Sequence, residues 1–327
     1  MNAIKRRDFL TFSARAAAVA TLANLKVSGP AQAAEGPSQT ILKKALIVDK
    51  PTEEDFKKLK DAGFDGVEAS PQPAPQAEKA RAAADKLGLR IHSVLRGWAE
   101  FNSRDPAKVE STLAITEAAL NAAKSYGADA VLLVPCRIGG MKTPRPWEFQ
   151  IDFDPQTGHV RKVVQGDNAP FREYIEAHNH AIDTSRAAVK RLIPTAEKCG
   201  VVIALENVWN NLWVQPALFQ HFVASFANPW VKAYFDIGNH VKYFCSEKWI
   251  LSLGSLLAKC HVKDFKLNPA DPNGEGEFVN IRDGSVLWPV VRAALEIVGY
   301  HGWLTIEGGN LSMAEHSRRL DAIVAGK

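Results

Sequence analysis

Eight short apolar runs, separated from one another by helical patterns, occur between residues 44 and 307. Runs of this length that are rich in Val, Ile and Leu are typical of parallel strands buried on both faces. Regular alternation of such strands with helices favours a parallel sheet whose crossover helices cover its faces. The strands are expected at residues 44–48, 65–68, 90–94, 130–134, 201–206, 232–236, 256–262 and 303–307.

Eight strands in this pattern predict an α/β fold of the (β/α)8 TIM-barrel type, which typically takes about 250 residues. The chain has 327 residues, so a single barrel domain over residues 42–327 accounts for most of it. Glycine follows five of the expected helices, where it can end a helix in the left-handed conformation: Gly63, Gly88, Gly127, Gly200 and Gly299. The helices are expected at residues 52–62, 76–87, 106–126, 171–199, 216–226, 248–253, 288–298 and 313–324.

The connection after the fourth strand, residues 137–170, is too long for an ordinary strand-to-helix loop and is rich in Gly, Pro and Asp. Within it, residues 148–153 and 160–164 flank a turn-forming segment, 154–158, and predict a β-hairpin. Loops that follow barrel strands rise from the catalytic mouth. We therefore expect a lid or specificity element, with a surface loop of no functional consequence as the alternative.

The N-terminal residues have the pattern of an export signal. Lys5, Arg6 and Arg7 precede a weakly apolar stretch, and Ala31-Gln32-Ala33 is a small-residue cleavage site. We expect a twin-arginine signal over residues 1–33, a linker over 34–41 and a periplasmic or otherwise exported protein. An amphipathic first helix is the alternative, whereas a membrane anchor would need about 20 apolar residues.

The charge balance depends on this signal. Removing residues 1–33 takes away five of the 40 basic residues and one of the 36 acidic ones, which leaves 35 of each. The sequence pI of about 8.8 therefore does not indicate a nucleic-acid-binding face. We expect no nucleic-acid partner and no stable membrane association after export, while a homo-oligomer is compatible with the sequence. The four cysteines have no metal-binding or disulfide-framework spacing and are expected to be small buried or semi-buried residues.

Four of the expected strands end on residues that can bind a metal ion: Glu206, Asp236, His261 and Glu307. They are 30, 25 and 46 residues apart, spacings that fit successive strand–helix–strand units. Taken singly, each has a structural explanation, because a carboxylate at a strand end often caps a helix and a lone histidine is often a core residue. Since a parallel barrel gathers its strand ends at one mouth, the four together predict one metal site.

Three carboxylates and one imidazole suit a hard divalent cation, with Mn²⁺ the first expectation and Mg²⁺ or Co²⁺ the alternatives. Glu206 and Glu307 belong to strands five and eight and should face one another across the metal. Two opposed carboxylates can remove a proton from one face of a carbon and deliver one to the other. A metal that polarises the adjacent carbonyl would make that proton acidic enough to remove. The catalytic residues are therefore predicted to be Glu206 and Glu307.

Further polar and aromatic residues are expected near the same mouth and are candidates for binding substrate. Lys263 could hold a substrate oxygen or a developing enolate, or could simply pair with Asp264. His240 could contact substrate or lie on the surface, and Glu68 could form a buried salt bridge instead. The full set of candidates is Glu68, His92, Arg96, Trp209, Asn210, Asn239, His240 and Lys263.

Three segments carry a family resemblance: residues 204–210 (ALENVWN), 234–239 (YFDIGN) and 261–265 (HVKDF). They resemble the xylose isomerase-like TIM barrel superfamily, specifically its sugar phosphate isomerase/epimerase branch, which includes L-xylulose-5-phosphate 3-epimerase and hexulose-phosphate isomerase. The similarity extends over about residues 42–324. It implies that Glu206, Asp236, His261 and Glu307 bind the metal and that the two glutamates move protons.

The sequence departs from this family at two places. Ketose 3-epimerases of the superfamily commonly have a histidine three residues after the metal-binding aspartate, where this chain has Asn239 and places His240 one position later. The insertion at 137–170 would also reshape the substrate pocket. Both departures put a simple ketose 3-epimerase assignment in doubt.

The expected function is a metal-dependent sugar isomerase or epimerase that acts through an enediolate. Export, and the absence of an obvious phosphate-binding loop in the sequence, favour a free sugar, keto-sugar or glycoside over a sugar phosphate. The same first step could end in elimination from a keto-glycoside, so a lyase is one alternative, and a non-catalytic sugar-binding protein is another. A nuclease like the AP endonucleases of this fold would need more metal ligands and a basic face, and is disfavoured.

Overall fold

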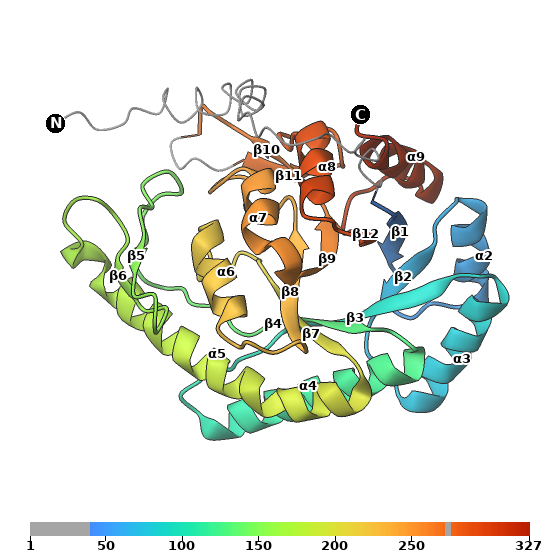
Figure 1. Cartoon of the computed structure of the whole chain (residues 1–327), viewed down its shortest axis with the longest axis horizontal. Helices are drawn as coiled ribbons and strands as arrows, with labels where there is room; N and C mark the ends of the chain where they lie inside the picture. Colours follow the sequence, from blue (N-terminus) through green and yellow to red (C-terminus); the bar gives the residue numbers. More distant parts are fainter. Residues whose placement is uncertain (1–39, 272–275) are drawn as a thin grey trace, which may run out of the picture. The chain divides into compact units, whose positions relative to one another are not determined.

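The computed structural model describes residues 40–271 and 276–327. Eight parallel strands close into a barrel in the order β1-β12-β9-β8-β7-β4-β3-β2, and the helices lie outside them (Figure 1). The predicted barrel and all eight predicted strands are confirmed. The barrel strands are β1 (Leu42–Ile47), β2 (Gly66–Ala69), β3 (Arg90–Trp98), β4 (Ala130–Val134), β7 (Val202–Glu206), β8 (Val231–Asp236), β9 (Leu257–Val262) and β12 (Gly302–Ile306).

Each predicted helix is present, with ends shifted by no more than two residues. Their termini have local causes. At the start of α2, the Thr52 hydroxyl accepts from the backbone N–H of Asp55 and the Asp55 carboxylate accepts from the backbone N–H of Thr52, which forms a capping box. The helices are α2 (Glu53–Asp61), α3 (Ala74–Lys86), α4 (Pro106–Tyr126), α5 (Arg172–Cys199), α6 (Pro216–Ala224), α7 (Ser246–Leu253), α8 (Trp288–Ile297) and α9 (Met313–Val324), with 3-10 turns at Ala169–Phe171 and Gly254–Leu256.

The five glycines predicted to end helices all have positive φ. The angle is 72° at Gly127, which caps α4, and 67° at Gly200, which caps α5. An L residue is strained in this conformation, whereas glycine is not. The repeated glycine is therefore what lets each of these helices stop and the chain turn back to the next strand.

Strand β3 is longer than predicted because it continues to pair with β4 through Trp98. The pairing skips one residue, since Leu95 is opposite Leu132 and Gly97 is opposite Leu133. Arg96 is the skipped residue. Such a bulge redirects a side chain that strict alternation would have placed elsewhere. Arg96, a predicted substrate contact, therefore lies on a different face of the strand from the one that alternation predicts.

The predicted hairpin in the insertion is confirmed in a shorter form, as β5 (Asp152–Phe153) and β6 (Val160–Lys162). Its turn is fastened to the outer helices: Arg186 of α5 donates to the Thr157 carbonyl at 2.7 Å, and a ring nitrogen of His221 of α6 lies 2.8 Å from the Pro155 carbonyl. Figure 1 shows the hairpin beside α5 and α6. These contacts give the hairpin a bracing role and do not support the expectation that it moves as a lid.

A second hairpin, β10 (Asp264–Leu267) with β11 (Gly276–Val279), follows β9 and was not predicted from the sequence. Its base depends on Asp264, whose carboxylate accepts hydrogen bonds from the backbone N–H groups of four residues and from one indole. The donors are Phe265, Arg282, Gly284 and Val286 through their backbone and Trp288 through Nε1. The alternative that Asp264 pairs with Lys263 is therefore wrong.

Replacing Asp264 by Ala is expected to lower the free energy of unfolding by about 3 kcal/mol or more, because several buried N–H groups would lose their acceptor together. Urea unfolding of the purified variant measures the change. Asp283→Ala is the matched control, since Asp283 lies in the same loop but its side chain is 47% exposed and pairs with Arg319. Equal losses in the two variants would contradict this role of Asp264.

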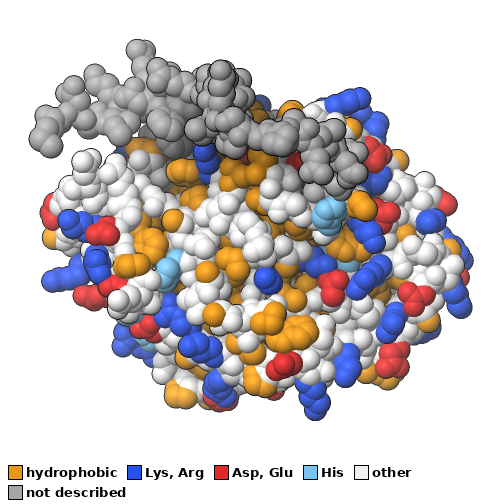
Figure 2. Space-filling view, viewed as in Figure 1, with side chains coloured by type: hydrophobic (Ala, Val, Ile, Leu, Met, Phe, Trp, Pro, Cys, Tyr) orange, Lys and Arg blue, Asp and Glu red, His pale blue; other side chains and the backbone are white. Residues whose placement is uncertain are grey.

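The face shown in Figure 2 has Lys and Arg interspersed with Asp and Glu around its edge, without one continuous basic area. Across the part of the chain that is described, no helix is both long and apolar enough to cross a bilayer. The predicted export signal (1–33) and nearly all of the predicted linker (34–41) lie outside the described residues.

Candidate metal centre

The four predicted metal ligands lie at the ends of four adjacent barrel strands. Glu206 and Asp236 are the last residues of β7 and β8, His261 is in β9, and Glu307 directly follows β12. The barrel order places β12, β9, β8 and β7 side by side. One ligand atom from each of the four residues lies within 4.8 Å of the others. Residues up to 101 positions apart in sequence are therefore brought to one point by the barrel's closure.

Several of these ligand atoms are buried without a hydrogen-bond partner among the described residues, namely Asp236 Oδ2, His261 Nδ1 and Glu307 Oε2. Buried polar atoms are normally hydrogen-bonded, and exceptions call for an explanation. The polar atoms nearest to them are charged neighbours, since His261 Nδ1 lies 2.8 Å from Glu307 Oε2 and 3.6 Å from Glu206 Oε1. A shared cation is a candidate for the missing partner. Three carboxylates and an imidazole fit a divalent cation that prefers oxygen and nitrogen.

The other polar atoms of two ligands are held in place by the protein. Asp236 Oδ1 accepts from the backbone N–H groups of Gly238 and Asn239 at 2.8 and 2.7 Å, which leaves Oδ2 directed at the cluster. Gly238 is required for this turn, since a Cβ there would lie 2.6 Å from the Lys263 carbonyl oxygen. The turn after β8 thus orients the carboxylate before any ligand binds.

His261 is oriented from behind by Glu68. Its Nε2 lies 2.6 Å from Glu68 Oε2, while Ser93 donates to Glu68 Oε1 at 2.7 Å. Glu68 is completely buried. A carboxylate that accepts the Nε2 proton leaves Nδ1 with its lone pair free for a metal, a common arrangement behind metal-binding histidines. Glu68 was a predicted substrate contact, and the structure instead places it behind a metal ligand.

Replacing Glu68 by Gln is expected to weaken Mn²⁺ binding by about 10- to 100-fold, because a single amide oxygen cannot accept from both His261 and Ser93. Titration of the metal by calorimetry measures the loss, and ¹⁵N NMR of His261 reports which ring nitrogen carries the proton. Ser93→Ala keeps the Glu68 carboxylate and should have a smaller effect. Unchanged affinity in Glu68→Gln would show that the pair serves only packing.

The charges of the centre shift the pKa values of its members. Burial raises the pKa of Asp236 to about 7, with the Glu307 and Glu206 carboxylates adding to the effect and Lys263 opposing it. Burial also raises the pKa of Glu206. The pKa of Glu307 is lowered despite burial, because His261 and Lys263 stabilise its charged form. Burial works against a charged His261, yet the carboxylates of Glu68 and Glu307 raise its pKa well above the usual value. The net surplus of negative charge is what a divalent cation would neutralise.

Lys263 and Asn239 link the side chains of Glu307 and Glu206 through a chain of polar contacts. Lys263 Nζ lies 3.1 Å from Glu307 Oε2 and 3.5 Å from Asp236 Oδ2, and it donates to Asn239 Oδ1 at 3.2 Å. Asn239 Nδ2 in turn donates to Glu206 Oε1 at 3.4 Å. Both predicted substrate-binding residues are therefore at the centre, in reach of anything bound there.

The other predicted substrate contacts occupy several positions. Trp209 lies at the mouth and donates from Nε1 to the Asn239 carbonyl. Asn210 is buried beside the mouth, and its Nδ2 has no hydrogen-bond partner among the described residues. His240 is 2% exposed, and its Nδ1 lies 3.1 Å from Asn207 Nδ2. Burial lowers the pKa of His240 to about 3, so it is a neutral, buried residue and not the surface residue that was the alternative.

Two predicted contacts, His92 and Arg96, make their hydrogen bonds to residues that are not part of the centre. His92 is completely buried, stacks on Trp303 at 4.3 Å, and has Nε2 2.9 Å from Thr305 Oγ1. Arg96, the bulged residue of β3, donates to Thr116 Oγ1 at 3.1 Å and Thr112 Oγ1 at 2.9 Å, both in α4. The bulge turns Arg96 outward, and a sequence without a visible bulge signal could not predict this.

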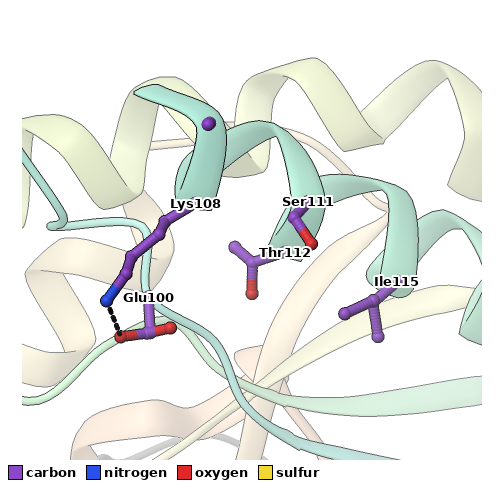
Figure 3. A pocket seen from close by; sticks show the side chains of 6 residues that line it. Glu100, Lys108, Ser111, Thr112 and Ile115 are labelled. Carbon is purple, nitrogen blue, oxygen red and sulfur yellow. Dashed lines mark ion pairs between the residues drawn. The ribbon is translucent and has the colours of Figure 1, made fainter. Parts of the chain in front are cut away.

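A depression on the outer surface of α4 is a separate feature (Figure 3). Lys108 and Glu100 approach each other across it at 3.9 Å, and Ser111, Thr112 and Ile115 line it. None of the four metal-ligating residues lines it. The depression is therefore separate from the candidate metal centre.

Comparison with known proteins agrees with this geometry. The sequence profile of a family described as "xylose isomerase-like TIM barrel" matches residues 56–323, and no curated protein matches the sequence. A D-tagatose 3-epimerase-like protein is 16% identical with a TM-score of 0.65, covering 86% of this chain and 97% of its own.

Two further solved structures have the same fold. A 3-keto-D-glucoside 4-epimerase from E. coli is 15% identical with a TM-score of 0.63, covering 87% of this chain and 99% of its own. An L-ribulose 3-epimerase is also 15% identical with a TM-score of 0.63, covering 88% and 94%. At these identities the superpositions establish a shared fold.

Proposed function

The chain belongs to the xylose isomerase-like TIM barrel family, and from this premise we propose that it is a metal-dependent sugar isomerase or epimerase. The reaction is a proton transfer at a carbon next to a carbonyl. The observation that carries the proposal is the convergence of Glu206, Asp236, His261 and Glu307, each of which places one possible ligand atom within 4.8 Å of those of the other three. Among the described residues, the three carboxylates outnumber the one cation that contacts them, Lys263, so a divalent cation would neutralise the charge that remains.

The two glutamates supply the proton transfer. Glu206 and Glu307 come from strands three places apart in the barrel order, with His261 between them. A sugar carbon between their carboxylates can lose a proton to one and regain a proton from the other. A divalent cation, Mn²⁺ first and Mg²⁺ or Co²⁺ as alternatives, would polarise the carbonyl and stabilise the charge that develops on its oxygen.

Lys263 and Asn239 bind the substrate's oxygens in this proposal. The ammonium group of Lys263 is positioned by Asp236, Glu307 and Asn239, so it is oriented before substrate arrives. A fixed positive charge at a site where an enediolate forms lowers the barrier, because no reorganisation is needed during the reaction.

The substrate we propose is a non-phosphorylated sugar or keto-sugar. Similar folds are known as a 3-keto-D-glucoside 4-epimerase and an L-ribulose 3-epimerase, names that describe unphosphorylated substrates. With a leaving group on the neighbouring carbon, the same proton abstraction would end in elimination, so a keto-glycoside lyase is the second candidate for this site.

Proton NMR in D₂O tests the proposal. The protein loaded with Mg²⁺, which is diamagnetic, is incubated with free ketoses, aldoses and 3-keto-glycosides. Deuterium uptake next to a carbonyl, abolished by a chelator and restored by metal, is the expected result. A metal-loaded protein that binds a sugar without any uptake would instead be a sugar-binding protein.

We also propose that residues 1–33 direct export by the twin-arginine pathway, which rests on Arg6, Arg7 and the Ala31-Gln32-Ala33 site. Changing both arginines to lysine keeps the charge and is expected to leave the protein in the cytoplasmic fraction, whereas the unchanged chain is expected in the periplasmic fraction. Changing Lys5 to Arg is the control. Export of the double variant at the same level would contradict the proposal.

A further inference from the structure

Three aromatic rings stand next to the metal-ligand cluster and take no part in it. Trp209 follows β7, and Phe265 and Phe278 face each other across β10 and β11. The ring centroids of Trp209 and Phe278 are 5.0 Å apart, those of Phe265 and Phe278 are 5.2 Å apart, and those of Trp209 and Phe265 are 5.6 Å apart. We call Trp209, Phe265 and Phe278 the aromatic wall.

Lys263 connects the aromatic wall to the centre. Its Nζ lies 3.1 Å from Glu307 Oε2 and 5.1 Å from the centroid of the Phe278 ring. Asn239 makes a second connection, since its side chain accepts from Lys263 and its carbonyl accepts from the Trp209 indole. Only the Lys263 ammonium group therefore separates the Phe278 ring from Glu307, one of the two carboxylates that are proposed to move the proton.

The wall is rigid and partly open to solvent. Phe265 is completely buried and Phe278 is 45% exposed. The base of their hairpin is fixed by the five hydrogen bonds to Asp264. Lys242 Nζ lies 3.4 Å from the centroid of the Trp209 ring, and the Trp209 N–H is bonded within the protein, so the exposed ring surface of the wall is mainly that of Phe278. An exposed aromatic side chain on a fixed support beside a polar centre is typical of a ligand-binding surface.

We propose that the aromatic wall is a subsite for a second ring attached to the reacting sugar, so that the substrate is a glycoside and not a free monosaccharide. This deepens the proposed function and rests on it. The keto ring needs oxygen-binding groups, which the metal ligands, Lys263 and Asn239 supply. A neighbouring sugar or aglycone ring needs a surface for its apolar C–H face, which the exposed ring of Phe278 supplies, with Trp209 packed against it.

The kinetic test compares one-ring and two-ring substrates on the metal-loaded full-length protein. Phe278→Ala is expected to raise the KM for a 3-keto-disaccharide about tenfold while leaving exchange into a 3-keto-monosaccharide within about twofold. Phe278→Trp should retain the preference, because it keeps an aromatic face. Phe244→Ala is the matched control, since Phe244 is 40% exposed and is not part of the wall. An equal effect of Phe278→Ala on both substrates, or none on either, would overturn the proposal.

A binding test separates this proposal from the proposed function. In a Glu307→Gln background, calorimetry with the same two sugars measures affinity without turnover. The expected result is tighter binding of the disaccharide, lost in Phe278→Ala. If that result is found but the unmodified protein catalyses no exchange, the aromatic subsite is supported and the proposed reaction is contradicted. If exchange is found but the disaccharide binds no more tightly than the monosaccharide, or binds equally well to Phe278→Ala, the proposed reaction is supported and the aromatic subsite is contradicted.

Discussion

Replacing Glu206 by Gln is expected to slow metal-dependent deuterium exchange into the sugar by roughly 10²- to 10⁴-fold, the usual contribution of a positioned acid–base group. Glutamine has nearly the same shape but cannot take up a proton. Glu307→Gln should have an effect of similar size, because the proposed transfer uses a carboxylate on each side of the carbon. The rate is measured by NMR in D₂O at saturating metal.

The interpretation of these variants depends on the metal still being bound, so metal content is measured in each preparation. Glu110→Gln is the control, since Glu110 is exposed and pairs with Arg191 at 2.7 Å, on the outer helices. If either active-site variant exchanged at the normal rate with metal bound, that glutamate would have no role in proton transfer.

The second large effect is expected from Asp236→Asn, which should weaken Mn²⁺ binding by at least about 100-fold. The amide oxygen can still accept from the backbone N–H groups of Gly238 and Asn239, so the turn keeps its structure. The amide nitrogen would replace Oδ2, and it is a donor where the metal needs an acceptor. Calorimetric titration gives the affinity directly.

Thermal unfolding supplies an independent measurement for the same variant. A ligand that binds only the folded state raises the unfolding temperature, so Mn²⁺ should raise the Tm of the unmodified protein and not that of Asp236→Asn. Asp321→Asn is the control, because Asp321 pairs with Lys44 and its side chain is 62% exposed. Equal stabilisation of all three proteins by Mn²⁺ would place the metal somewhere else.

The barrel and the clustering of the four candidate ligands could be predicted from the sequence because each depends on local pattern and order. Runs such as residues 130–134 are buried along their whole length, and a strand buried on both faces shows as a continuous apolar run. Glu206 and Asp236 end such runs, where a charge is costly without a partner. The order of strands in a (β/α)8 barrel then places their ends together.

The surroundings of the ligands depended on contacts that sequence spacing does not reveal. Glu68 and His261 are 193 residues apart, and only closure of the barrel makes them hydrogen-bond. The bulge at Arg96 reverses the direction expected from alternation. The hairpin containing Phe265 and Phe278 was missed although the turn-forming pairs Asn268-Pro269 and Asn273-Gly274 lie between its strands. Each of its strands has only four residues, too few for a clear pattern.

The sequence by itself determined the alternation of strands and helices, the helix ends at glycine and the choice of the four candidate metal ligands, since all of these follow from chemistry within a few residues of the chain. The tertiary structure decided which atoms of those residues are free to bind a ligand. It also directed Glu68 and Lys263 to opposite sides of the centre and placed an aromatic surface beside it. These features arise where side chains from distant strands compete for the same space and hydrogen bonds, a competition that is resolved only when the barrel closes.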